Sequence, residues 1–346
     1  MIIDRRTLMM STAGLVLAAG ARPASAQGAV AVRVGFVPVI GASALYVMQA
    51  SGMAEKDGLK LALTKFDSGP NAIQALASGT LDIMVIGVSP IAVAKSKGID
   101  VSVAASGAYG GSAFAAGPAL DKAFKEAGGD PAKAFAAFRA ANGRPAKLGT
   151  LPPGGVPTVA LHHWLWKVGK VDKADVQIVA MGIEAVQQAM LTGAVDGGTL
   201  LEPSVTIVTD RDPRIKRIAV ATEMFPQIPG VVIAVSGAFL KAQPDAAERF
   251  VAQAIRATEL IKSAPDKAAP YVNAVLGGGL VSESLMAAAL KSPAVKFETD
   301  PRVTAAATAE LLAYQVELGD FPAAPKTEGL FDMALYERAA KRAAAN

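Results

Sequence analysis

The sequence predicts an α/β protein of two lobes, each a mainly parallel sheet flanked by helices, with a ligand cleft between the lobes. Two observations lead to this fold class. Short β-branched runs alternate with Ala-rich helical patterns through the first two thirds of the chain, which is typical of βαβ units around a parallel sheet. In addition, one nine-residue segment occurs twice, which indicates two lobes of similar construction.

The alternation begins with a strand predicted over residues 30–37 and a helix over 44–50. Strands near 59–66, 82–86 and 101–105 follow, with helices over 71–78 and 90–97 between them. From about residue 237 the pattern becomes helical, with helices predicted over 244–263, 267–275, 282–290, 301–317 and 332–345. Most of these are amphipathic, and we expect them to complete the first lobe by covering its sheet.

The internal repeat consists of residues 74–82 and residues 188–196. The first copy reads Gln-Ala-Leu-Ala-Ser-Gly-Thr-Leu-Asp and the second Gln-Ala-Met-Leu-Thr-Gly-Ala-Val-Asp. Each copy ends a helix with glycine, where a left-handed cap is needed, and starts a strand after aspartate. Chance similarity between two helix ends is the alternative, because glycine caps are common. Two copies are too few for a solenoid, so the repeat favours two similar lobes.

The cleft is expected beyond the strands that end at residues 87–90 and 200–203, because ligands of open α/β sheets bind outside the carboxyl ends of strands. Residues 105–116 are rich in Gly, Ser and Ala, and residues 226–230 hold two prolines and a glycine. We interpret these segments as the two places where the chain crosses between the lobes, a hinge of two segments. The first lobe then comprises residues 27–108 and 232–346, and the second residues 109–231.

Residues 1–26 are predicted to be a cleavable signal peptide. Arg5 and Arg6 precede an apolar stretch over residues 8–21, and Ala24-Ser25-Ala26 fits a small-residue cleavage site, so cleavage is expected after Ala26. The paired arginines also resemble a twin-arginine signal, which leaves Sec and twin-arginine export both open. No later stretch approaches the length of apolar sequence that a transmembrane helix needs.

Composition and motifs exclude several classes of function. The absence of cysteine excludes disulfides, thiolate metal sites, cysteine nucleophiles and a lipid-modified cysteine. Scattered Lys and Arg residues give no nucleic-acid footprint, and no nucleophile elbow, phosphate loop, dinucleotide motif or zinc-protease motif occurs. The only histidines, His162 and His163, point about 100° apart on a helix and cannot chelate one ion from one face. We therefore expect no catalytic residue, no metal and no cofactor.

Helix starts at the cleft supply most of the candidate ligand-binding positions. Two glycines before Pro157 expose backbone N–H groups at the positive end of a helix, which suits an anion, although a simple capped turn is the alternative reading. Serines before two helices of the facing lobe offer hydroxyl and N–H groups in the same way. These positions are Ser68, Gly69, Ser89, Gly154, Gly155 and Val156.

Four further residues are candidates for contact with the ligand. Ser43 and Tyr46 follow the first strand, and Tyr109 lies in the predicted hinge. Glu202, before Pro203, places a carboxylate at the cleft wall. It either caps its own helix or binds a cationic or hydroxyl group of a ligand.

A series of short motifs runs through residues 30–240. In chain order they are Val34-Gly-Phe-Val-Pro38, Leu45-Tyr46, Gly52, Gly58-Leu59, residues 74–82, Gly87-Val-Ser-Pro90, Lys97-Gly98, Met181-Gly182, Asp196 and Glu202-Pro203. This series resembles the periplasmic substrate-binding proteins of ABC importers for nitrate, sulfonates, taurine and related compounds. The resemblance implies a hinged periplasmic-binding-protein fold, type II-like. It also implies a ligand held by the loop after the first strand, the Ser-Pro loop, the glycine loop and the Glu-Pro loop.

The chain departs from that family at the glycine loop, where many members carry Gly-Ser in place of Gly154-Gly155. No arginine occurs in these loops to pair with a sulfonate or carboxylate, so an anionic ligand would depend on backbone N–H groups.

The resemblance implies a monomeric solute receptor that captures a small anionic solute by lobe closure. Its partners are expected to be that solute and an ABC permease with its ATPase in the inner membrane, without nucleic acid. Because a cysteine-free chain cannot be tethered by a lipid, the predicted location is the periplasm. Two alternatives stay open: an enzyme on the same fold, similar to those that make the thiamine pyrimidine, and a sensory protein that reports ligand to a membrane receptor.

Overall fold

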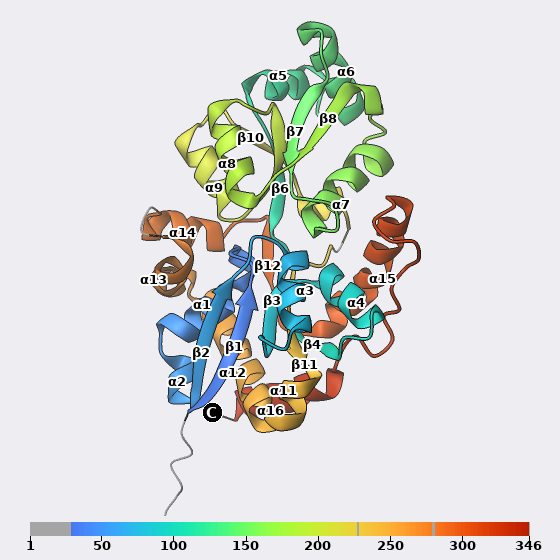
Figure 1. Cartoon of the computed structure of the whole chain (residues 1–346). Helices are drawn as coiled ribbons and strands as arrows, with labels where there is room; N and C mark the ends of the chain where they lie inside the picture. The colour runs from blue at the N-terminus through green and yellow to red at the C-terminus, as the bar shows by residue number, and fades with distance from the viewer. Residues whose placement is uncertain (1–28, 227, 279–280, 346) are drawn as a thin grey trace, which may run out of the picture.

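The computed structural model describes residues 29–226, 228–278 and 281–345. They form two lobes, each with its own sheet flanked by helices (Figure 1). The signal peptide predicted for residues 1–26 and its cleavage site lie outside the described residues. Within the described ranges, no helix has both the length and the apolarity that a membrane crossing requires.

The sheet of the first lobe has the order β2 (Leu59–Lys65), β1 (Val30–Phe36), β3 (Ile83–Gly87), β11 (Val231–Ser236) and β4 (Val101–Ser106). Strands β2, β1 and β3 pair in parallel, whereas β11 runs antiparallel to both β3 and β4. The inner strand β11 is apolar up to its last residue, Ser236, and is buried along its whole length, as expected for a strand covered on both faces. The edge strand β2 instead has exposed positions along its length.

The sheet of the second lobe repeats this arrangement with β8 (Val176–Ala180), β7 (Ala146–Thr150), β9 (Gly197–Leu201), β6 (Ser112–Ala116) and β10 (Lys216–Val220). Strands β8, β7 and β9 are parallel, and β6 is antiparallel to both β9 and β10. The expected mainly parallel sheets are confirmed, with one antiparallel strand at the fourth position of each.

The two copies of the internal repeat end at equivalent points, directly before β3 and β9. The Oδ2 atoms of Asp82 and Asp196 accept the backbone N–H groups of Arg33 and Lys147, both at 2.8 Å. Asp82 and Asp196 also donate their own N–H groups to the carbonyl groups of Arg33 and Lys147, respectively, both at 2.8 Å. The side chains of Arg33 and Arg144 pair with the two carboxylates. The repeat therefore ties β3 to β1 in the first lobe and β9 to β7 in the second.

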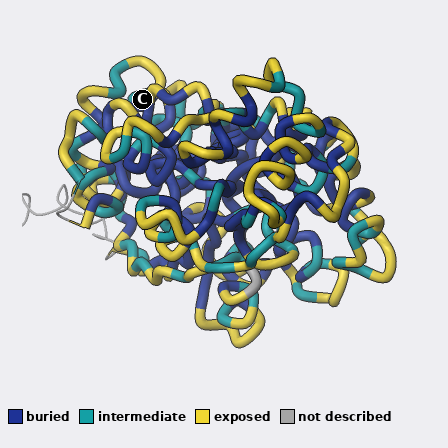
Figure 2. The backbone as a smooth tube through the Cα atoms, turned by 90° about the horizontal axis from the view of Figure 1, so that it is seen from above, coloured by how far each residue is buried: buried dark blue, intermediate teal, exposed yellow. Residues whose placement is uncertain are grey.

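Helices follow the strands in both lobes, as the alternating pattern predicts. Those of the first lobe are α1 (Ser43–Ala50), α2 (Met53–Lys56), α3 (Gly69–Ala77), α4 (Val88–Ser96) and α11 (Gly237–Ala242). Those that follow β6 in the chain are α5 (Pro118–Glu126), α6 (Pro131–Asn142), α7 (Val156–His163), α8 (Ile183–Thr192), α9 (Ser204–Arg211) and α10 (Ala221–Met224). Buried backbone fills the centre of the molecule and exposed backbone its outline (Figure 2).

The C-terminal helices are α12 (Pro244–Ser263), α13 (Pro265–Leu276), α14 (Glu283–Leu290), α15 (Pro301–Glu317) and α16 (Met333–Ala344). As expected, most pack on the first lobe: α12 and α13 contact α1, and α15 and α16 contact β4. The structure also shows contacts that the helical pattern did not predict, because α14 reaches α9 and α15 reaches α7. The short strand β12 (Val295–Phe297), between α14 and α15, pairs with β5 (Ala108–Gly110) and so holds both helices beside the second lobe.

Candidate functional site

Two segments of chain connect the sheets of the lobes. The chain leaves the first sheet after Ser106, forms β5, and enters the second sheet at Ser112. It returns from β10 through α10 and enters β11 at Val231. The segments meet each other, because Gly110 donates its N–H to the carbonyl of Ile228 at 3.1 Å. The segments interpreted as a hinge therefore lie where the chain passes between the two sheets, side by side.

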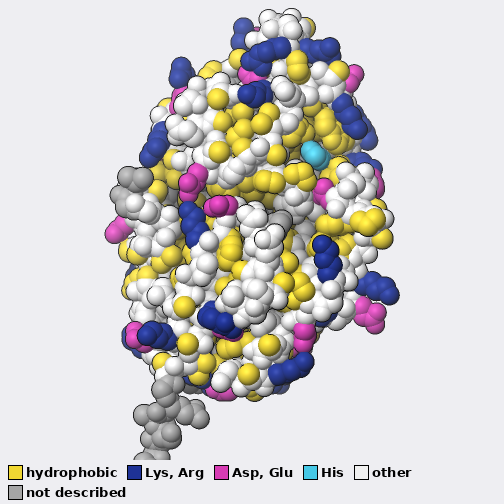
Figure 3. Space-filling view, viewed as in Figure 1, with side chains coloured by type: hydrophobic (Ala, Val, Ile, Leu, Met, Phe, Trp, Pro, Cys, Tyr) yellow, Lys and Arg dark blue, Asp and Glu magenta, His cyan; other side chains and the backbone are white. Residues whose placement is uncertain are grey.

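A cavity of about 800 Å³, counted to its open mouth, lies between the lobes. The loops after β1, β2 and β3 form its wall on the first lobe, and the loops after β7 and β9 form the facing wall. This is the position that ligands take in open α/β sheets, outside the carboxyl ends of the strands. Hydrophobic side chains gather between the lobes on the face shown in Figure 3.

The cavity wall is apolar. Its larger side chains are Val37, Val39, Leu151, Val156, Leu201 and Val231, and glycines and prolines form much of the remainder. Among the described residues, Asp67 is the one ionisable residue in this wall, and it is exposed. Such a wall can enclose an apolar body and offers backbone groups for hydrogen bonds.

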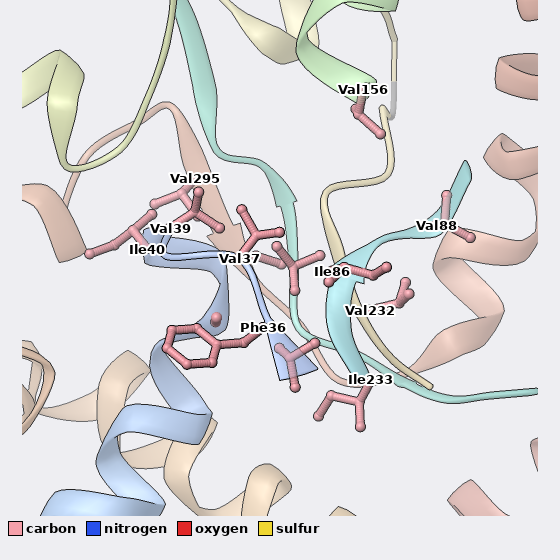
Figure 4. Packing of buried hydrophobic residues seen from close by; sticks show 14 of the residues in the cluster. Phe36, Val37, Val39, Ile40, Ile86, Val88, Val156, Val232, Ile233 and Val295 are labelled. Atoms are coloured by element: carbon pink, nitrogen blue, oxygen red, sulfur yellow. The ribbon is translucent and has the colours of Figure 1, made fainter. Parts of the chain in front are cut away.

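The lobes touch at the cavity. Val156, at the start of α7, extends toward the first lobe (Figure 4), and its Cγ2 lies 3.4 Å from where a Cβ on Gly87 would stand. Outside the cavity, Lys65 on β2 pairs with Glu184 on α8 at 3.0 Å. This ion pair is exposed and stabilises the contact by no more than about 1 kcal/mol. The lobes are therefore in contact without a strong polar lock at this point.

Four of the ten residues predicted to bind ligand line this cavity: Ser68, Gly69, Gly155 and Val156. Ser68 and Gly69 lie at the start of α3, and Gly155 and Val156 at the start of α7. Gly154 precedes Gly155 with φ +84°, a conformation that favours glycine, and is not part of the wall. Facing helix starts thus come together as the sequence suggested.

Ser43 and Tyr46 do not line the cavity. The Ser43 hydroxyl donates to the carbonyl of Ile40 at 2.6 Å. The Tyr46 hydroxyl lies 3.2 Å from the carbonyl of Val39, and its ring packs edge-on against Phe36 at 5.6 Å. Both side chains are fully buried, and burial raises the pKa of the Tyr46 hydroxyl. They hold the loop after β1, which in turn places Val39 in the wall.

Ser89 and Tyr109 are also buried behind the wall. Ser89 lies between Gly87 and Pro90, which do line the cavity, but its own side chain is fully buried, and the described residues offer its Oγ no hydrogen-bond partner. The Tyr109 hydroxyl lies 3.5 Å from Thr304 on α15. For both residues the backbone neighbours reach the cavity while the side chain points elsewhere.

Glu202 is fully buried and caps its own helix, which was one of the two alternatives. Its Oε2 accepts the N–H of Thr206 in the first turn of α9 at 3.1 Å, while Oε1 has no partner among the described residues. The backbone of Glu202 joins three segments. Its N–H donates to the carbonyl of Gly111, and its carbonyl accepts the N–H of Ile40, both at 2.9 Å. Burial raises the pKa of the Glu202 carboxyl, since the charged form is removed from water.

Replacing Glu202 by glutamine is expected to stabilise the protein increasingly as the pH rises. A raised pKa means that the folded protein binds this proton more tightly than the unfolded chain does, where the ordinary value is 4.5. Wild-type stability therefore falls as the pH rises from about 4.5 through the folded pKa, by about 1.4 kcal/mol for each pH unit between these two values. Thermal unfolding of both proteins between pH 4 and pH 8 measures the difference in stability between them. A difference that is the same at every pH would contradict the raised pKa of Glu202.

The sequence predicted the segments of the wall but not its apolar surface. Val37, Val39, Leu151 and Leu201 lie at or just after strand ends, where hydroxyls, glycines, aromatic residues and one carboxylate were the candidates. Asp67, which precedes Ser68 in the loop after β2, was not predicted either. These residues could have been identified by their position directly after a parallel strand. That position faces the ligand side of the sheet, whether the residue is apolar or polar.

Comparison with known proteins places the chain in a family. Residues 25–276 match the model of the NMT1-like family. The nitrate import ATP-binding protein NrtC of Synechococcus elongatus is 23% identical over 66% of this chain, which spans only 35% of that relative. A putative binding protein of Brucella abortus is 25% identical, with 68% of each chain covered.

Solved structures share the fold. The periplasmic nitrate-binding protein NrtA from Synechocystis PCC 6803 superposes with a TM-score of 0.75 at 16% identity, over 91% of this chain and 89% of that one. The periplasmic aliphatic sulphonate-binding protein SsuA from Escherichia coli gives a TM-score of 0.68 at 15% identity, over 89% of this chain and 98% of that one. The two sheets, the cavity between them and the family match agree: the chain belongs to the NMT1-like family and has the periplasmic-binding-protein fold.

Proposed function

We propose that this protein is the solute-binding component of an ABC importer, which captures a small molecule in the cavity between its lobes and presents it to a permease. The observation that carries the proposal is a single cavity built by both lobes. A ligand can drive closure only by binding the closed state better than the open one. A solute that touches both walls at once meets that condition.

The same proposal assigns the parts of the chain. Residues 27–108 with 232–346 and residues 109–231 move as the two lobes, and the two connecting segments act as the hinge. A cleaved signal peptide delivers a monomer to the periplasm, where it works with a permease and its ATPase. The relatives described as import and binding proteins support this assignment.

The cavity favours binding over catalysis. Acid–base or nucleophilic chemistry needs a titratable group held in place by a partner. Asp67 is the one ionisable residue that the described chain contributes to the wall, and it is exposed. Nor do the described residues contain a group of three His, Asp or Glu side chains that could hold a metal ion.

A small-molecule extract of the source cells, filtered below about 1 kDa, should raise the melting temperature of the purified protein. Ligand that binds only the folded state stabilises it by RT ln(1 + [L]/Kd), about 2.7 kcal/mol at a hundredfold excess over Kd. The upshift should grow with extract concentration, and mass spectrometry of the protein-bound fraction identifies the solute. An unchanged melting temperature at every extract concentration would contradict solute capture.

A further inference from the structure

We infer that the captured solute is an uncharged, mainly apolar molecule that carries a hydrogen-bond acceptor, and not a strongly hydrated anion such as nitrate. This inference rests on the proposed function and names the class of ligand that the same cavity takes. It departs from the anionic solute that the sequence led us to expect.

The first reason is the composition of the wall. Apolar side chains from both lobes face the cavity, among them Val37 and Val39 on one side and Leu151 and Val156 on the other. Burying apolar surface of a ligand against them stabilises the complex by about 25 cal/mol per Å². Within the described ranges no Lys, Arg or His belongs to the wall, although arginine is the usual partner of oxyanions. An anion would lose its hydration there without gaining a charged partner.

The second reason is the charge around the cavity. Lys65 lies close to the wall in sequence, but its ammonium pairs with Glu184 at 3.0 Å. The one acidic residue of the wall acts in the opposite direction, because the carboxylate of Asp67 disfavours a second negative charge in the cavity.

The third reason lies in the helix starts, which would otherwise favour an anion. The N-termini of α3, α4 and α7 meet the cavity, and their dipoles attract negative charge. However, each helix has a proline among its first three residues, at positions 70, 90 and 157, and proline lacks the N–H that an anion would need. In α7 the next N–H, of Thr158, bonds to the carbonyl of Gly155 at 3.1 Å.

The remaining backbone groups suit a neutral acceptor. One or two N–H groups at a helix start can hold a carbonyl oxygen or a ring nitrogen, whose partial negative charge the dipole also favours. Such a group adds direction to binding, while the apolar body of the solute fills the space between the valines.

Matched pairs of compounds test this inference. Benzamide and benzoate, nicotinamide and nicotinate, and hexanamide and hexanoate each share one body and differ in charge. Calorimetric titration of the full mature protein should show tighter binding of the amide in each pair, by about tenfold or more, which corresponds to about 1.4 kcal/mol. Nitrate and methanesulfonate serve as small anions and should not bind. Tighter binding of the carboxylates, or binding of either small anion, would overturn the inference.

Two arginine variants provide a second test, one in the wall and one at an exposed position as its matched control. Val156→Arg adds a guanidinium to the cavity and should reverse the order within each pair, whereas Val168→Arg changes a side chain that is 51% exposed and should leave the order unchanged. If no amide binds up to about 10 mM, the inference fails even when the cell extract raises the melting temperature. Solute capture itself fails only if the extract has no effect, so the two failures are distinguishable.

Discussion

Replacing Val156 by tryptophan is expected to weaken solute binding about 100-fold or more. Val156 begins α7 and lines the cavity from the second lobe, and its Cγ2 comes within 3.4 Å of a Cβ position on Gly87 in the first. An indole is much larger than an isopropyl group, so it would occupy the space for the solute. It would also meet Gly87 before the lobes could close. Binding would lose both apolar contact and closure, and a 100-fold loss is about 2.8 kcal/mol.

Val168→Trp is the control for this variant. Val168 lies a few residues after α7 but is 51% exposed and is not part of the cavity wall. Calorimetry with the solute recovered from the extract measures both affinities, and melting without solute verifies that each variant is folded. Wild-type affinity in a folded Val156→Trp protein would place the ligand outside this cavity.

Much of the fold could be predicted because its signals are local. Helices α12 (Pro244–Ser263) and α15 (Pro301–Glu317) match their predicted ranges, since each begins with a proline, which favours the first helical position. Helix α12 also continues in an amphipathic pattern. The repeat also revealed the two-sheet construction, because Asp82 and Asp196 make the same backbone contacts. The helix pattern and each copy of the repeat can both be recognised within a short stretch of sequence.

Contacts between distant segments could not be predicted in the same way. Strand β12 (Val295–Phe297) has three residues, too few for a periodic pattern, yet its pairing with β5 (Ala108–Gly110) brings α14 and α15 against the second lobe. The antiparallel strands β6 and β11 resemble the parallel strand β3 in sequence, because all three are short, mostly apolar runs. Strand direction depends on the connections around the whole sheet.

The candidate site was predictable only as a set of loops. Glycine and serine before a helix mark a backbone turn, and this located Gly155 and Ser68 at the cavity correctly. The direction of a side chain is set by packing around it, so Tyr46 and Ser89 were expected near the ligand but are fully buried. The polar residues chosen for their chemistry support the wall from behind, and apolar residues form its surface.

Closure of the lobes around a solute is the central claim, and a distance across the mouth of the cleft tests it most directly. Because the chain has no cysteine, Ala62→Cys on β2 and Ala185→Cys on α8 can be spin-labelled specifically. Both alanines are exposed and lie near Lys65 and Glu184, which pair across the lobes.

The label-to-label distance should be measured by pulsed electron paramagnetic resonance with and without the solute. We expect a broad distribution in its absence and a shorter, narrower one at saturation, because only the closed state lets the solute touch both walls. An unchanged distribution at a solute concentration that raises the melting temperature would contradict the account.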